Sequence, residues 1–222
     1  MKQLKNQKGF TLVEIAIVLV IIGLLLGGVL KGQELIQNAK VKRLVDDMKG
    51  TQAMLASYQD RYRALPGDDL TAATRFPVLG ASPAATNGNG NGLIAGGKFD
   101  NAAVESKSFW QHVRRANLAT GSAAIPSTVA ATYLPGNPYG GVYGVNSTLN
   151  IIGLIGSMSV CANNVPGDAA IRIDQMADDG VSNTGTIMVR ANIATGAATN
   201  NNAAATAPPL ALATAYTVCW GI

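Results

Sequence analysis

The residues best suited to bind an ion lie in one short acidic loop. Asp178, Asp179 and Asn183 offer two carboxylates and one amide oxygen around Gly180, which permits a tight turn. Such oxygens are the ligands that calcium takes in proteins. The spacing does not fit an EF-hand loop, and a turn rich in Asp and Asn forms without any ion. The sequence requires no cofactor, and calcium at this loop remains an expectation beside a plain turn.

Other residues argue against an enzyme. His112 is the only histidine, which excludes a metal site built from several histidines, and beside Trp110 it is expected to be a packing or surface residue. No Ser or Cys stands in an evident His–Asp context, and no phosphate-binding glycine motif is present. Arg114 and Arg115 form no basic-aromatic cluster of the kind that binds nucleic acid, so no nucleic-acid site is evident.

An apolar stretch from Lys8 to Leu30 dominates the N-terminal part of the chain. Its conspicuous polar side chains are Thr11 and Glu14. At a rise of ~1.5 Å per residue, this stretch is long enough as a helix to span the ~30 Å hydrocarbon core of a bilayer. A charged carboxylate at the centre of such a helix costs about 2.5–3.5 kcal/mol, and less near the interface. Glu14 is therefore expected to find a cationic partner.

The segment before this stretch orients it. Met1 to Gly9 carries Lys2, Lys5 and Lys8 and no acidic residue, which favours the cytoplasmic side for the N-terminus. No small-residue cleavage site of a secretory signal follows Leu30, so the helix is expected to be retained. The leader holds three of the 17 basic residues of the chain. Without it, 14 basic residues remain against 13 acidic ones. The basic pI is thus largely an effect of the leader and indicates no acidic partner.

Lys8-Gly9, followed by Phe10-Thr11-Leu12-Val13-Glu14, resembles the processing site of type IV prepilins and of type II secretion pseudopilins. The resemblance implies that a prepilin peptidase cuts between Gly9 and Phe10 and N-methylates Phe10. It also implies that Glu14 pairs with the N-terminal amine of a neighbouring subunit during assembly, which supplies the expected cation. The implied partners are the peptidase, an inner-membrane assembly platform and other pilins, in a homo- or hetero-oligomeric filament.

The family's architecture is an α+β fold in which a long N-terminal helix packs on a C-terminal antiparallel sheet. The expected parts are the leader 1–9, a transmembrane and filament-core helix 10–30, an amphipathic continuation 31–65 and a globular domain 66–222 in the periplasm or outside the cell. The continuation carries one apolar stripe at helical spacing. Its members are Val41, Leu44, Val45, Met48, Leu55, Tyr58 and Tyr62.

Within the globular part, patterns of β-branched and aromatic residues predict strands in 132–145, 149–160 and 186–193. A short helix is expected over 105–118, with Phe109, Trp110, Val113 and Leu118 inward. A second short helix is expected near Ile171, with Ile171, Ile173 and Met176 buried. The three Asn-Gly repeats of 87–92 indicate a flexible surface loop.

Cys161 and Cys219 are the only cysteines. In an exported domain an even count favours a disulfide, although two buried free thiols are the alternative. The pair resembles the C-terminal disulfide loop of many pilins. Major pseudopilins also carry calcium in their C-terminal region, which makes the acidic loop a candidate analogue.

The sequence thus predicts a structural subunit of a type IV pilus or a type II secretion pseudopilus, held in the inner membrane by a single span before assembly. One alternative is a minor pilin that acts as a binding, adhesion or DNA-uptake module, which would be scarce in sheared filaments. The other is a membrane-anchored enzyme with an uncleaved helix, which would retain Met1 to Gly9.

Overall fold

The computed structural model describes residues 11–80, 83–100, 104–126, 133–147, 153–195 and 205–222. The predicted cleavage site at Gly9 and Phe10 lies outside these ranges. The chain divides into two compact units, Met1–Ala39 and Lys40–Ile222. Helix α1, Leu12–Tyr62, contributes residues to both.

In the first unit, the part of α1 from Leu12 to Leu30 is strongly apolar, and the described residues leave its side chains uncovered. Every residue from Leu12 to Leu30 is exposed. Within the described residues, α1 is the one helix that is long and apolar enough to cross a membrane, and its most apolar window has a mean hydropathy of 2.8.

In the second unit, the remainder of α1 is amphipathic, as its sequence pattern predicts. Val41, Leu44, Val45, Met48 and Tyr58 are buried. Leu55 and Tyr62, the other members of the predicted stripe, are half-buried. Fully burying an aliphatic or aromatic side chain contributes about 1.5–3 kcal/mol, so this stripe anchors the helix to the domain.

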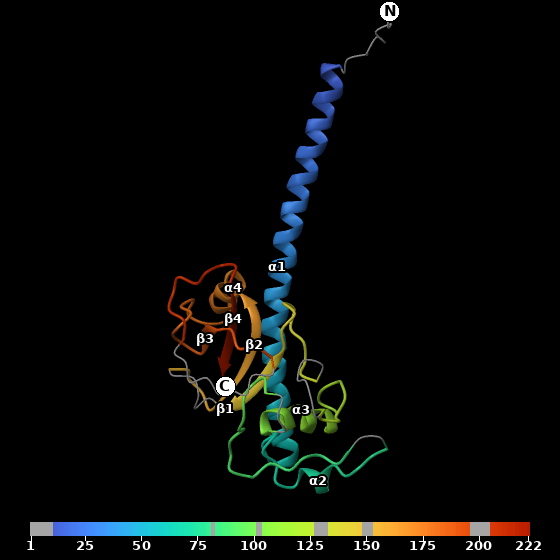
Figure 1. Ribbon diagram of the computed structural model, residues 1–222, viewed down its shortest axis with the longest axis vertical. Helices are drawn as coiled ribbons and strands as arrows, with labels where there is room; N and C mark the ends of the chain where they lie inside the picture. The colour runs from blue at the N-terminus through green and yellow to red at the C-terminus, as the bar shows by residue number, and fades with distance from the viewer. Residues whose placement is uncertain (1–10, 81–82, 101–103, 127–132, 148–152, 196–204) are drawn as a thin grey trace, which may run out of the picture. The chain divides into compact units, whose positions relative to one another are not determined.

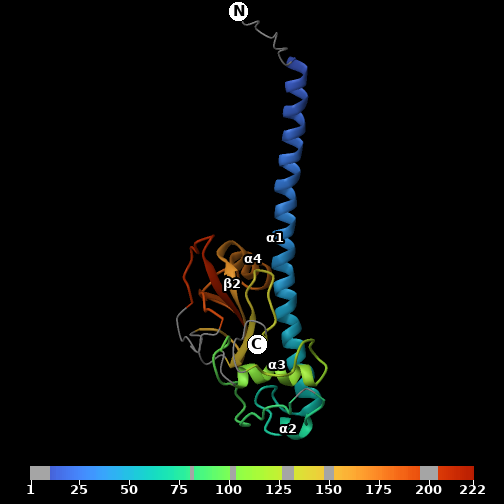
Figure 2. The same ribbon diagram turned by 45° about the vertical axis from the view of Figure 1, so that its right-hand side comes forward.

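The stripe packs on a four-stranded antiparallel sheet, which confirms the predicted α+β class (Figure 1). Its strands lie in the order β1-β2-β4-β3. The bounds are Tyr143–Ser147 for β1, Met158–Pro166 for β2, Ile187–Ala191 for β3 and Ala215–Gly221 for β4. Figure 2 shows the part of α1 that belongs to the second unit beside the same sheet, after a 45° turn. Tyr143 Oη donates a hydrogen bond to Asp47 at 3.0 Å, and Lys49 Nζ lies 5.8 Å from the centre of the Trp220 ring.

The remaining helices are α2 (Ala72–Arg75), α3 (Glu105–Arg115) and α4 (Gly167–Ala177). α3 buries Phe109, Trp110 and Val113 as expected, but it ends before Leu118, which is half-buried. α4 begins directly after β2, earlier than predicted, and this changes its buried face.

The buried residues of α4 are Gly167, Ala169, Ala170, Ile173 and Asp174. Ile173 is buried as predicted and Ile171 is half-buried. The prediction for Met176 was wrong, since its side chain is 54% exposed. The buried face is centred on Ala170 and Asp174, and Met176 lies at its edge, close to the end of the helix.

The Asn-Gly segment lies at the surface, as predicted, but hydrogen bonds hold it in place. The carboxylate of Asp68 accepts backbone hydrogen bonds from Gly90, Asn91 and Gly92, at 2.6, 3.2 and 2.7 Å. A Cβ at Gly88 would lie 2.3 Å from the Asp68 Cα, so only glycine fits there. The repeats therefore wrap around the end of the turn that follows α1.

Candidate functional site

The N-terminus of α1 is closed by a reciprocal pair of side chains. Glu14 Oε2 accepts hydrogen bonds from the backbone N–H and from the hydroxyl of Thr11, each at 2.8 Å. The Glu14 backbone N–H in turn donates to Thr11 Oγ1 at 3.3 Å. This is a capping box, a Thr followed three residues later by a Glu, and it satisfies orphan amides of the first turn. The role of Glu14 in assembly stays a prediction. The capping role of Thr11 was not recognised from the sequence, although the T-x-x-E spacing is typical of a capping box.

The acidic loop also differs in detail from its sequence reading. Asp178 Oδ2 accepts the Ile187 N–H at 2.6 Å, and Asp179 accepts the Val181 N–H at 2.8 Å and the Thr184 hydroxyl at 2.6 Å. These bonds shape the turn between α4 and β3. Asn183, the third predicted ligand, is half-buried in the same turn.

The structure adds Asp174, from the last turns of α4, to this loop. One carboxylate oxygen from each of Asp174, Asp178 and Asp179 lies within 4.8 Å of the others. Asp174 is fully buried, and neither of its oxygens has a hydrogen-bond partner among the described residues. Burial first, and then the charges of Asp179 and Asp178, raises the pKa of Asp174 to about 6. The backbone amide of Gly180 acts in the opposite direction to burial and lowers the pKa of Asp174.

A buried carboxylate without a partner is unfavourable unless a proton or a cation compensates it. Asp174 also lines a cavity of about 230 Å³, together with Ile171, Ser182 and Leu210. The oxygen ligands and the uncompensated charge fit a hard cation such as calcium. Sequence reasoning missed Asp174, because Asp178 and Asp179 lie beyond the last residue of α4 and reach Asp174 only through the turn that follows the helix.

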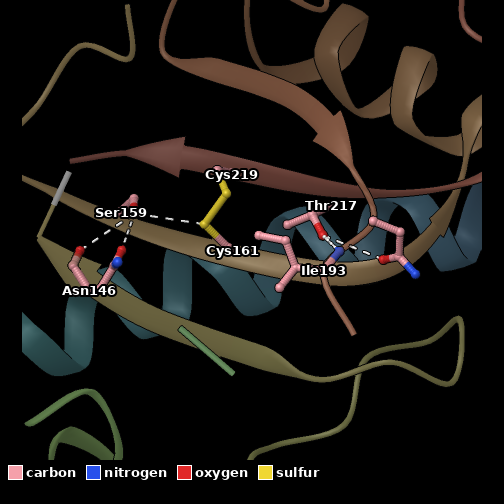
Figure 3. The surroundings of a disulfide bond; sticks show 7 residues. Asn146, Ser159, Cys161, Ile193, Thr217 and Cys219 are labelled. Atoms are coloured by element: carbon pink, nitrogen blue, oxygen red, sulfur yellow. Dashed lines mark hydrogen bonds between the residues drawn. A yellow bond between two sulfur atoms is a disulfide. The ribbon is translucent and has the colours of Figure 1, made fainter. Parts of the chain in front are cut away.

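The predicted disulfide joins Cys161 and Cys219, so the two cysteines are not free thiols. The pair sits directly opposite in the register of β2 and β4, the two central strands (Figure 3). Its surroundings are buried and polar: Ser159 Oγ lies 3.7 Å from Cys161 Sγ and donates to Asn146 Oδ1 at 2.9 Å. The bond thus closes a 58-residue separation across the centre of the sheet.

His112 is buried, and both of its ring nitrogens contact backbone groups of other segments. Its Nδ1 accepts the Gly67 N–H at 2.9 Å, and its Nε2 lies 2.8 Å from the Thr86 carbonyl oxygen, which it can meet only as a donor. These partners assign the neutral tautomer with the proton on Nε2. Burial lowers the pKa of His112, against the opposing effects of the Thr86 carbonyl and Asp69. Both ring nitrogens are occupied in linking α3 to the turn after α1 and to the start of the Asn-Gly segment.

Comparison with known proteins gives one positive result, at the N-terminus. A family model described as the prokaryotic N-terminal methylation motif matches residues 4–30, which include Gly9, Phe10 and Glu14. Neither the search of curated proteins nor that of solved structures found a match. The motif supports processing by a prepilin peptidase. Together with the long helix packed on an antiparallel sheet, it supports membership of the type IV pilin and pseudopilin family.

Proposed function

We propose that the chain is a structural subunit of a type IV pilus or of a type II secretion pseudopilus, assembled through the first part of α1. The observation that carries this proposal is the uninterrupted exposure of Leu12 to Leu30. An apolar surface of this size is unfavourable in water, so it must be covered by lipid or by other helices.

In this proposal, assembly replaces the lipid around the apolar segment by the helices of neighbouring subunits. In the membrane, lipid surrounds the apolar segment, with the N-terminus on the cytoplasmic side and the domain on the other. In the filament, neighbouring copies of the same segment take the place of lipid, and the Glu14 carboxylate pairs with the amine of a neighbour's Phe10. Buried in this apolar core, an unpaired charge would be costly, and the pairing therefore sets the register between subunits.

The test compares Glu14→Ala with Glu34→Ala, which removes a carboxylate from the same helix outside the apolar segment. We expect Glu14→Ala to leave the subunit folded, oxidised and present in membranes, but to lower the yield of sheared filaments by about tenfold or more, the equivalent of ~1.4 kcal/mol. Glu34→Ala should assemble normally. Normal filament yield from Glu14→Ala would contradict the pairing.

We also propose that Asp174, Asp178 and Asp179 hold a calcium ion. The buried, unpartnered carboxylate of Asp174 supports the proposal. A divalent cation there would compensate the three negative charges and fix the turn between α4 and β3. Calcium would then be a structural ion that stabilises the domain.

A further inference from the structure

A hollow of about 450 Å³ opens between two segments that are far apart in the sequence. Arg75, Phe76, Pro77 and Val78 line one side of it, and Arg114 and Arg115, from the end of α3, line the other. Among the described residues that line this arginine pocket, none is acidic. The hollow therefore combines three guanidinium groups with an apolar wall.

Arg114 is a fixed cation in this wall. It is 9% exposed, and its guanidinium donates to the carbonyl oxygens of Thr120, Ser122 and Tyr133, at 3.2, 3.1 and 2.6 Å. Its centre also lies 4.5 Å from the centre of the Tyr133 ring. These neutral partners hold the side chain in place, and no carboxylate of the described residues forms an ion pair with it.

The other two arginines are only partly engaged. Arg115 donates from one terminal nitrogen to the Pro77 carbonyl oxygen. Arg75 donates to Asp69 at 3.0 Å and to the Thr71 hydroxyl at 2.9 Å. A guanidinium carries five N–H donors, so both groups keep donors for a further ligand. Among the described residues, one of the three arginines, Arg75, pairs with a carboxylate, so the pocket has an excess of positive charge.

We propose that the arginine pocket binds a small phosphorylated organic molecule. Guanidinium groups match the oxygens of a phosphate in paired hydrogen bonds, and they are strongest where water is partly excluded. Phe76, Pro77 and Val78 offer an apolar surface for the organic part of the ligand. The volume falls within the ~300–1,000 Å³ of small-molecule sites. The proposal does not depend on assembly into a filament.

The binding test uses the full chain in detergent and phenyl phosphate as the probe, with inorganic phosphate and phenol as comparators. In equilibrium dialysis at low salt we expect one saturable site per chain for phenyl phosphate, with a Kd of about 1 mM or below. Inorganic phosphate and phenol should each bind more weakly, because each keeps only half of the interactions. Added salt should weaken binding of phenyl phosphate. No saturable binding, or equal binding of phenol, would overturn the proposal.

Variants at Arg115 test whether this pocket is the binding site. Arg115 suits the test because it is half-buried and its one described hydrogen bond is to a carbonyl oxygen. Arg115→Gln should weaken phenyl phosphate binding by about tenfold, the loss expected for one charge-assisted hydrogen bond. Arg115→Lys should restore only part of it, since lysine keeps the charge but not the planar fork. Arg43→Gln, which removes a charge from α1 outside the pocket, is the control. Equal weakening by Arg43→Gln and Arg115→Gln would show non-specific attraction and overturn the site.

Discussion

Glu14 accepts two hydrogen bonds from Thr11, one from its backbone N–H and one from its hydroxyl, and both measure 2.8 Å. The carboxylate that is expected to pair with a neighbouring subunit is thus already satisfied within its own chain. This internal pairing gives the carboxylate two hydrogen-bond partners without any contribution from another subunit. In the proposed assembly, Glu14 would therefore have to exchange or share this partner with the amine of an incoming subunit.

The first prediction concerns Asp174 and calcium. Because its pKa is raised from 3.8 to about 6, the Asp174 carboxylate is charged at pH 7 at a cost to the folded state, which grows between these two pH values and is complete above the higher one. Without calcium, Asp174→Asn should therefore raise the unfolding temperature at pH 7. With calcium, wild type should gain stability as RT ln(1 + [Ca]/Kd), while the variant should not.

The measurement is thermal unfolding at pH 7, in excess chelator and then in millimolar calcium. Asp46→Asn, which changes an exposed carboxylate on α1, is the control and should respond to calcium as wild type does. An unfolding temperature of wild type that is the same with chelator and with calcium would contradict the metal assignment.

The second prediction concerns pH and His112. Its pKa in the folded state is lowered from 6.5, so the unfolded chain takes up the proton first when pH falls. Stability is complete above pH ~6.5 and is lost as pH falls below that value, by at most about 1.4 kcal/mol per pH unit for one group. Protonation would place an N–H on Nδ1 against the Gly67 N–H.

Urea unfolding at pH 7.5 and pH 5.5, in the presence of chelator, measures this effect. Asp174 has a raised pKa and opposes it over the same range, so the informative quantity is the difference between wild type and His112→Gln. That difference should shrink as pH falls. A difference that stays constant with pH would rule out the neutral tautomer.

The third prediction concerns the Asn-Gly segment. Asp68→Asn removes the charge that three backbone amides share and leaves an NH2 group facing donors. We expect a loss of about 3 kcal/mol in the free energy of unfolding, as for hydrogen bonds to a charged group. Hydrogen exchange should rise at Gly90, Asn91 and Gly92, while Asp60→Asn, an exposed control, leaves it unchanged. Exchange that stays slow in Asp68→Asn would show that other contacts hold the loop.

The fourth prediction concerns the disulfide. Replacing both Cys161 and Cys219 by Ala removes a cross-link that closes a 58-residue separation, which the loop-entropy model values at about 4 kcal/mol. Urea unfolding of the double variant should show this loss, and reduced wild type should show a similar one. A double variant as stable as oxidised wild type would contradict a stabilising role for the bond.

Local patterns made parts of this molecule predictable. The stripe from Val41 to Tyr58 repeats at helical spacing, and the motif around Gly9 and Glu14 is contiguous in the sequence. Both could therefore be recognised without knowledge of the tertiary structure. Strand β4 was not predicted, because Ala215–Gly221 follows an Ala- and Thr-rich stretch and becomes a strand through pairing with β2 and β3.

The rest of the candidate sites depended on tertiary structure. Asp174 looked like one more residue of a short helix until the turn after α4 brought Asp178 and Asp179 back to it. Arg114 and Arg115 indicated no binding site in the sequence, because Arg75, which lines the same pocket, lies about forty residues earlier in the chain. Such groupings arise from chain reversals that no local spacing encodes.

The most direct test of the account is the mass and N-terminal sequence of the chain recovered from sheared surface filaments and from membranes of the same cells. We predict a chain that begins at N-methylated Phe10 and lacks two hydrogens for the Cys161–Cys219 bond. We also predict that it is present in a filament or, for a pseudopilus, in filaments formed when the subunit is overproduced. A chain that still begins at Met1 and never leaves the membrane would contradict the role of a filament subunit.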